Sequence, residues 1–278
     1  MKKKLTLVVT SVLLVAALVI GGTLAYFTDS ADQVNTFTVG NVKIKLDETK
    51  AGNTQVSDMD RTEADQTYTE AMAPGKSFVK DPKITIKDGS QDAYVFLKIE
   101  MNKYVSLVNL MGVDAYKNNI GGLRGEYPGF TAFMTNLASD ANLRAAVVDR
   151  WFTGINHADW KVMNQDEITA AVTGAAGQTN PNQLSVVLGY IGSDDDTLSA
   201  GDSVTFMTAF GMPSTVTSSM FDGEDAYYIN GVSKSNFNTK EATFKMTFTA
   251  YAIQKAELAN IDAAYTAMFP TSTTTTTE

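Results

Sequence analysis

The sequence predicts a mainly β protein: an antiparallel β-sandwich with a helix-containing insertion and a short C-terminal helix. Several short segments alternate apolar and polar residues, which is the period of a half-buried strand. Turns that contain Gly or Pro separate these segments. Strands with one apolar face bury it by packing as two sheets over a shared core. Between them, one long stretch has apolar residues at helical spacing instead.

The chain begins with the pattern of an export signal. Three lysines precede an uncharged, mostly apolar run over residues 5–20. That run is shorter than the roughly 20 residues of a membrane-spanning helix, which favours a signal peptide over residues 1–25. Thr23 and Ala25 are small residues suited to signal peptidase, so we predict cleavage after Ala25 and a mature chain starting at Tyr26. An uncleaved anchor is the alternative, and the intact mass of the exported protein separates the two.

Composition excludes several classes of function. The predicted signal contains three lysines and no acidic residue, so its removal leaves 253 residues and changes the net charge from −9 to −12. Nucleic acid is therefore not an expected partner, because its binding needs a basic surface. The chain has no cysteine, so its stability depends on a packed core over a single domain, residues 26–270. The Thr-rich tail, residues 271–278, has nothing apolar to bury and is predicted to be disordered.

The mature chain is predicted to begin with a strand that ends at Leu46. Phe37 and Val39 share one parity, whereas the apolar residues after Gly40 share the other. One extra residue at this point would bring the apolar side chains before and after Gly40 to the same face of the strand. We therefore predict a bulge or bend at Gly40. The polar run before this strand, TDSADQ, is expected to be flexible before assembly.

Two acidic segments are weak candidates for a cation site. Residues 47–73 are polar and predict a surface loop, in which Asp58 and Asp60 lie close together. Asp194 and Asp196 belong to the turn-rich segment GSDDDTLSAGD. The first segment lacks the glycine and spacing of an EF-hand loop, and the consecutive carboxylates of the second point in divergent directions along an extended chain. Solvated loops are therefore the favoured interpretation of both segments. No metal and no cofactor is expected.

The remaining strands follow from their alternation. Residues 84–86 and 93–101 flank a Gly-containing turn, which suggests that the two strands are neighbours in one sheet. The longest alternating run, Ala242 to Ala252, is expected near the middle of a sheet. Three other segments read as strands: 160–163, 183–191 and 203–210.

Helical spacing dominates the insertion, residues 102–180. Residues 130–137 follow Pro-Gly, and residues 139–152 have apolar side chains at four-residue steps, with Ser139 or Asp140 as N-cap. We interpret the apolar stripe as packing rather than a binding site. A short helix is also expected after Asn260 as its cap.

Several blocks resemble the TasA and camelysin family of exported proteins. The first is the signal-to-strand segment GGTLAYFTDSADQVNTFTVGNVKIKL, and the second is APGKSFVKDPKITIKDGSQDAYVFLKI. Weaker likenesses are ADWKV and LSAGDSVTF, and a further block is TFTAYAIQKAELANIDAAYTAMFP. The stronger blocks lie at both ends of the mature chain, and apart from the weak likeness at ADWKV the insertion matches none of the family's segments.

The resemblance implies a jelly-roll-like sandwich exported through a SipW-type signal peptidase by a Gram-positive-type bacterium. Family members build fibres of the extracellular biofilm matrix by passing an N-terminal strand to the next subunit. Here the donor is Tyr26 to Val39, and its self-assembly residues are expected to be Tyr26, Phe27, Val34, Phe37 and Val39. The implied partners are further copies of the chain, the signal peptidase and other matrix proteins, and the implied location is the extracellular matrix or cell surface.

Two other classes of function stay open from sequence. The family name also implies a camelysin-like metallo-endopeptidase, but the chain has no HExxH motif and a single histidine, His157. One imidazole does not make the usual zinc site, so no catalytic residue is predicted. A monomeric cell-surface binding module is the third possibility. The chain has no LPxTG motif for covalent attachment to a cell wall.

Overall fold

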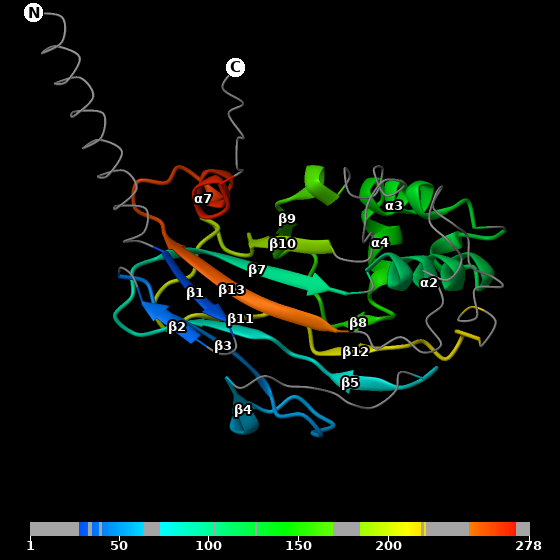
Figure 1. Ribbon diagram of the computed structural model, residues 1–278, viewed down its shortest axis with the longest axis horizontal. Helices are drawn as coiled ribbons and strands as arrows, with labels where there is room; N and C mark the ends of the chain where they lie inside the picture. Colours follow the sequence, from blue (N-terminus) through cyan, green and yellow to red (C-terminus); the bar gives the residue numbers. More distant parts are fainter. Residues whose placement is uncertain are drawn as a thin grey trace, which may run out of the picture.

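The computed structural model describes residues 28–32, 35–38, 41–63, 73–102, 104–125, 127–168, 184–217, 220 and 245–270. Its strands form three antiparallel sheets (Figure 1). The six-stranded sheet has the order β2 (Asn35–Thr38), β1 (Thr28–Asp32), β13 (Met246–Gln254), β7 (Ala93–Met101), β10 (Leu184–Tyr190) and β9 (Trp160–Val162). The four-stranded sheet has the order β11 (Ser203–Thr205), β6 (Lys83–Ile86), β3 (Ile44–Thr49) and β4 (Arg61–Thr62). The third sheet is β5 (Ser77–Val79), β12 (Ala209–Gly211) and β8 (Phe152–Thr153).

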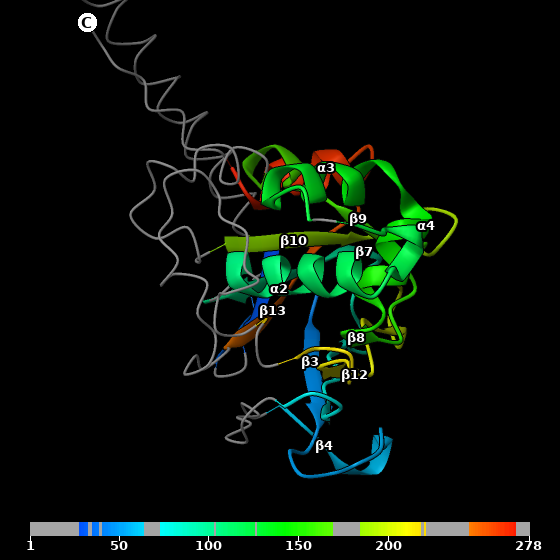
Figure 2. The ribbon, with the colours of Figure 1, turned by 90° about the vertical axis from the view of Figure 1, so that its right-hand side faces the viewer.

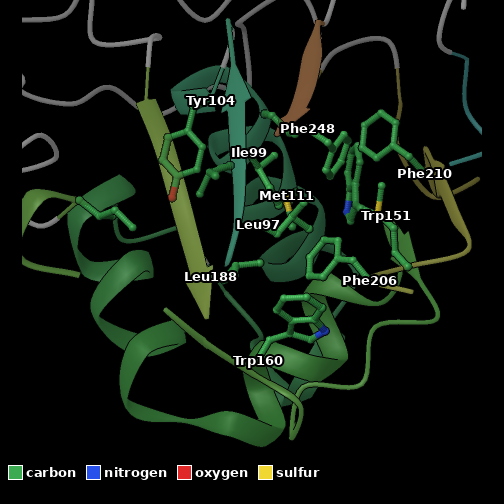
Figure 3. Packing of buried hydrophobic residues seen from close by; sticks show 14 of the residues in the cluster. Leu97, Ile99, Tyr104, Met111, Trp151, Trp160, Leu188, Phe206, Phe210 and Phe248 are labelled. Atoms are coloured by element: carbon green, nitrogen blue, oxygen red, sulfur yellow. The ribbon is translucent and has the colours of Figure 1, made fainter. Parts of the chain in front are cut away.

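The sheets form two layers around a main core. The six-stranded sheet lies over the two smaller sheets (Figures 1 and 2). Three helices gather at one end of the molecule: α2 (Tyr104–Lys117), α3 (Phe130–Ser139) and α4 (Ala141–Val148). Large aromatic side chains fill the interior between the layers, including Trp151, Phe206 and Phe248 (Figure 3). The predicted mainly β, sandwich-like architecture is thus confirmed. The finer jelly-roll topology stays a prediction.

The central strand β7 is buried on both faces. Val95 and Leu97 point into the main core, whereas Tyr94 and Phe96 belong to a second cluster beneath α7 (Ile261–Met268). The Phe96 ring lies 5.8 Å from that of Phe269, edge to face. Both faces of β7 are therefore apolar, because α7 covers the face that would otherwise be exposed to water.

The helices begin and end largely where capping chemistry predicts. The helix α3 spans Phe130–Ser139, and α4 spans Ala141–Val148. The N-cap of α4 is Asp140, whose side chain accepts hydrogen bonds from the backbone N–H groups of Asn142 and Leu143, and Asn260 caps α7 in the same way. Two short 3₁₀ turns, η1 (Asp58–Asp60) and η2 (Ile120–Gly122), also lie outside the sheets.

The helix α2 (Tyr104–Lys117) was not predicted. Its sequence, YVSLVNLMGVDAYK, is apolar on nearly all sides, so it lacks the one-sided stripe that marks a surface helix. Residues 107–115 are all buried. Gly112 allows this close packing, since a Cβ there would lie 2.4 Å from Cε2 of Tyr127.

Two strand predictions are corrected by the structure, and one is confirmed. The parity change at Gly40 does divide the segment, since β2 and β3 on either side of it belong to different sheets; the bulge or bend predicted at Gly40 lies outside the described residues. The strands β6 and β7 are not neighbours, because the turn between them crosses from one layer to the other. The strand expected over 203–210 is divided into β11 and β12, with both Phe206 and Met207 buried between them.

Candidate strand-pairing interface

The longest run of alternating residues in the sequence becomes β13, which is paired on both sides. Phe248, Ala250 and Ala252 point into the main core, and Ile253 packs on the opposite face beneath α7. On one side β13 pairs with β7 from Met246 to Gln254. The prediction that this strand lies away from the sheet edge is confirmed.

The other side of β13 is occupied by the chain's own N-terminal segment. The strand β1 runs antiparallel to β13, with Thr28 opposite Ile253 and Ala31 opposite Ala250. The polar run expected to be flexible, TDSADQ, is therefore largely a strand, β1, in this structure. It pairs with β13 through the backbone hydrogen bonds of an antiparallel ladder.

A hairpin continues the sheet outward. The strand β2 pairs with β1 and places Phe37 opposite Ser30. Within the described part of the chain, β2 is the outermost strand on this side. We call β1 and β2 together the N-terminal hairpin. It is an addition to one edge of the six-stranded sheet (Figure 1).

The predicted site residues are only partly described. Phe37 lies in β2, one strand removed from β13. The cleavage-site residues Thr23 and Ala25 lie outside the described residues. The same holds for four of the expected self-assembly residues, Tyr26, Phe27, Val34 and Val39.

A buried group of charged side chains lies beneath this edge. We call it the buried ionic cluster, and it consists of Asp47, Glu48, Arg61, Lys80 and Asp81. The strand β3, which carries two of these residues, packs against both β1 and β13. In addition, the Nζ atom of Lys80 lies 4.8 Å from the centre of the Phe248 ring on β13. The cluster thus supports the strand on which the N-terminal hairpin pairs.

Arg61 holds two carboxylates of the cluster. Its guanidinium donates to Oδ1 of Asp47 and, over 2.6 Å, to Oδ2 of Asp81. It also donates to the backbone carbonyls of both residues. Burial alone would lower the pKa of Arg61, but the hydrogen bonds with Asp47 and Asp81 outweigh it and raise that pKa. The pairing therefore keeps the guanidinium charged while its side chain is only 6% exposed.

The buried ionic cluster was missed from sequence, and its first residues were assigned to a surface loop. The structure corrects this, since β3 continues to Thr49 and residues 47–49 are all buried. A signal was present: Glu48 continues the parity of Ile44 and Leu46, whose side chains face the core. An acidic residue on the buried side of a strand indicates a buried partner.

The candidate cation ligands do not come together. Asp58 pairs instead with Lys83 at 3.1 Å, and Asp60 lies 3.5 Å from the side-chain amide of Asn53. Asp194 and Asp196 flank Asp195, whose carboxylate pairs with Lys255. Among the described residues no group of three or more metal-ligating side chains could hold an ion.

The histidine pairs with a neighbouring acid. The Nε2 atom of His157 lies 2.7 Å from Oδ1 of Asp149, at a partly exposed site. Nothing in the described residues brings a second histidine or a carboxylate cluster to it. Searching the same part of the chain for a bilayer-crossing helix, with enough length and apolar character, gives no candidate.

Comparison with known proteins gives one match. The model of a family described as camelysin metallo-endopeptidase matches residues 1–92. A search of curated proteins and a search of solved structures each find no match. The matched range includes the N-terminal hairpin, the buried ionic cluster and β6. Over residues 1–92, this chain therefore has the sequence pattern of the TasA/camelysin family, as its N-terminal blocks predict.

Proposed function

We propose that this protein is an exported structural subunit of an extracellular matrix, which forms fibres by giving its N-terminal strand to the next subunit. One observation carries the proposal: the segment that follows the predicted signal peptide pairs with β13 at a sheet edge. Exposed N–H and C=O groups on a sheet edge accept an added strand from any chain that presents it.

The N-terminal hairpin can exchange between subunits because β1 is joined to β13 by backbone pairing, which the β1 strand of any subunit can provide. If β1 leaves β13, the edge of β13 is left with unpaired backbone groups, which costs free energy. A β1 strand from another subunit restores the same hydrogen bonds in the same register. Because the contact is then head-to-tail and does not close, it extends into a filament. The balance between the closed subunit and the fibre is set by subunit concentration.

Cleavage after Ala25 is the proposed trigger. The donor begins at Tyr26, directly after the predicted cut, and β1 begins at Thr28. While the signal peptide is attached, this end of the chain is held at the membrane and cannot reach another subunit. A SipW-type signal peptidase would therefore control when assembly begins, outside the cell or at its surface. Other matrix proteins are further proposed partners.

Deletion of residues 26–35 from the mature chain is expected to abolish fibres. The deletion removes β1, so the subunit has nothing to donate and leaves its own β13 edge open. Negative-stain electron microscopy of the purified, processed protein is the measurement. Small amounts of this variant should also shorten wild-type fibres, because it can accept a strand but cannot pass one on. Deleting the tail, residues 271–278, is the matched control and should leave fibres intact. Undiminished fibres in the first variant would exclude this donor.

The family description favours a second candidate function, a metallo-endopeptidase. Its support is the family match alone, and in the described residues His157 is paired with Asp149 rather than with other ligands. Casein cleavage that is sensitive to chelators and lost in His157→Ala would favour this function over a structural one. A third outcome, a monodisperse monomer after processing, would favour a cell-surface binding module instead.

A further inference from the structure

The pair formed by Lys80 and Glu48 is largely shielded from water, within the buried ionic cluster. The Nζ atom of Lys80 lies 2.7 Å from Oε2 of Glu48, and the two side chains are 8% and 1% exposed. Glu48 is on β3, whereas Lys80 directly follows β5. The aromatic ring of Phe248 lies against the amine at 4.8 Å. The two reactive groups are thus held together in apolar surroundings by separate parts of the fold.

Glu48 differs from the other two carboxylates. Asp47 and Asp81 are both satisfied by Arg61, but Oε1 of Glu48 is buried and has no hydrogen-bond partner among the described residues. An ionised carboxylate with an unpaired oxygen is costly in the interior. Burial raises the pKa of Glu48 above its ordinary value, against the opposing effect of Lys80. Burial therefore makes the ionised Glu48 carboxylate less favourable here than it is in water.

We propose that Lys80 and Glu48 join through an intramolecular amide bond between Nζ and the side-chain carbonyl carbon. The two ions become one neutral amide with one donor and one acceptor, which removes the cost of a buried charge with an unpaired oxygen. Neither the family match nor the assembly proposal is needed for this inference. It rests on the position and burial of the two side chains.

The reaction is a condensation that needs no other reactant. The Lys80 ammonium gives a proton to Oε2 of Glu48 along their hydrogen bond, which leaves a neutral amine and a carboxylic acid. The amine lone pair then attacks the side-chain carbonyl carbon, and the C–N bond forms as the C=O electrons move onto oxygen. A proton passes from nitrogen to the hydroxyl group, the C–O bond breaks, and water leaves.

The amide bond would stabilise the fold, because of the two positions in the chain that it joins. It connects residues 32 positions apart and closes the chain segment between β3 and β5 into a loop. A covalent link across such a segment restricts the unfolded chain, as a disulfide does. This chain has no cysteine with which to form a disulfide. The link also fixes the layer that supports β13.

Intact-mass spectrometry of the folded, exported protein tests the proposal. We expect a mass about 18 Da below the sequence mass, the loss of one water molecule. The Lys80→Arg variant keeps the charge and hydrogen-bond donors but has no nucleophilic amine, so the full sequence mass should return. Lys83→Arg is the matched control, because Lys83 pairs with Asp58 at the surface, and the mass deficit should persist there.

A second measurement on the wild-type protein tests the proposal even if the Lys80→Arg variant does not fold. Proteolysis of the wild-type protein followed by tandem mass spectrometry should identify one branched peptide in which Lys80 and Glu48 are joined. Wild-type protein at its full sequence mass would overturn the proposal. A deficit that persists in folded Lys80→Arg would overturn it as well, because the water would then have been lost elsewhere, for example by cyclisation of an Asp-Gly pair.

Discussion

Replacing Arg61 with methionine is expected to lower the free energy of unfolding by about 3–5 kcal/mol, because removing one partner of a buried ion pair leaves buried charge without its full compensation. Among the described residues, Asp47 would keep only its pairing with the partly exposed Lys45, and Asp81 only its hydrogen bonds from Thr49, although both carboxylate side chains are at most 3% exposed. The Met side chain is similar in length but donates no hydrogen bond. Urea denaturation of the processed monomer, followed by tryptophan fluorescence, measures the loss.

A surface pair provides the control for Arg61. Lys83 and Asp58 lie 3.1 Å apart, with Asp58 77% exposed. Lys83→Met should therefore cost less than about 1 kcal/mol, as exposed ion pairs usually do. An equally small loss in Arg61→Met would show that Asp47 and Asp81 do not depend on Arg61, contrary to the geometry of the buried ionic cluster.

Truncating Phe248 to alanine should also cost about 3–5 kcal/mol, the usual range for a buried aromatic residue. The ring is 1% exposed, lies 6.4 Å from that of Phe206, and covers the amine of Lys80. Because the residue belongs to β13, the cavity would weaken the strand that pairs with β1. Thermal and urea unfolding measure the loss, and Phe248→Leu should show clearly less of it.

The control for the Phe248 substitution is a partly exposed side chain in the same sheet. Val162 on β9 is 38% exposed, so Val162→Ala should change stability by no more than about 0.5 kcal/mol. Similar losses in Phe248→Ala and Val162→Ala would mean that the core between the layers does not depend on β13. That result would contradict the packing shown in Figure 3.

Local patterns predicted most strands and caps, because each depends on neighbours along the chain. The alternation in β13, the N-cap of α4 at Asp140 and the cap of α7 at Asn260 are all short-range features. In contrast, the partners of β6 and β7 depend on which layer the connecting turn enters. No residue of the turn encodes that choice by itself, so two adjacent strands were wrongly expected to pair.

The parts of the candidate site differed in how far the sequence could predict them. The position of the proposed donor follows from the signal peptide, since only the first residues after a cut become free. Its division into β1 and β2 could not be predicted, because the sequence of β1, TDSAD, lacks the alternation of apolar and polar residues that marks a strand. The buried ionic cluster joins residues up to 34 positions apart, Asp47 and Asp81, through Arg61. Contacts of that range depend on the fold itself.

The chain's lack of cysteine allows the central claim to be tested by selective disulfide formation. Ala31 on β1 lies opposite Ala250 on β13, and opposed residues of an antiparallel pair are close enough for a disulfide. In a closed subunit, the double variant Ala31→Cys with Ala250→Cys should link within one chain. Oxidised before assembly, it should form no fibres, because its hairpin cannot leave.

The most direct measurement mixes processed Ala31→Cys subunits with processed Ala250→Cys subunits, oxidises the assembled fibres, and identifies disulfides by non-reducing electrophoresis and peptide mass spectrometry. Each chain then carries one cysteine, so a link between positions 31 and 250 must join two subunits. Strand exchange predicts that this link is abundant in fibres and missing from either variant alone. Fibres that form from the mixture without it would show that the subunits are held together by another contact.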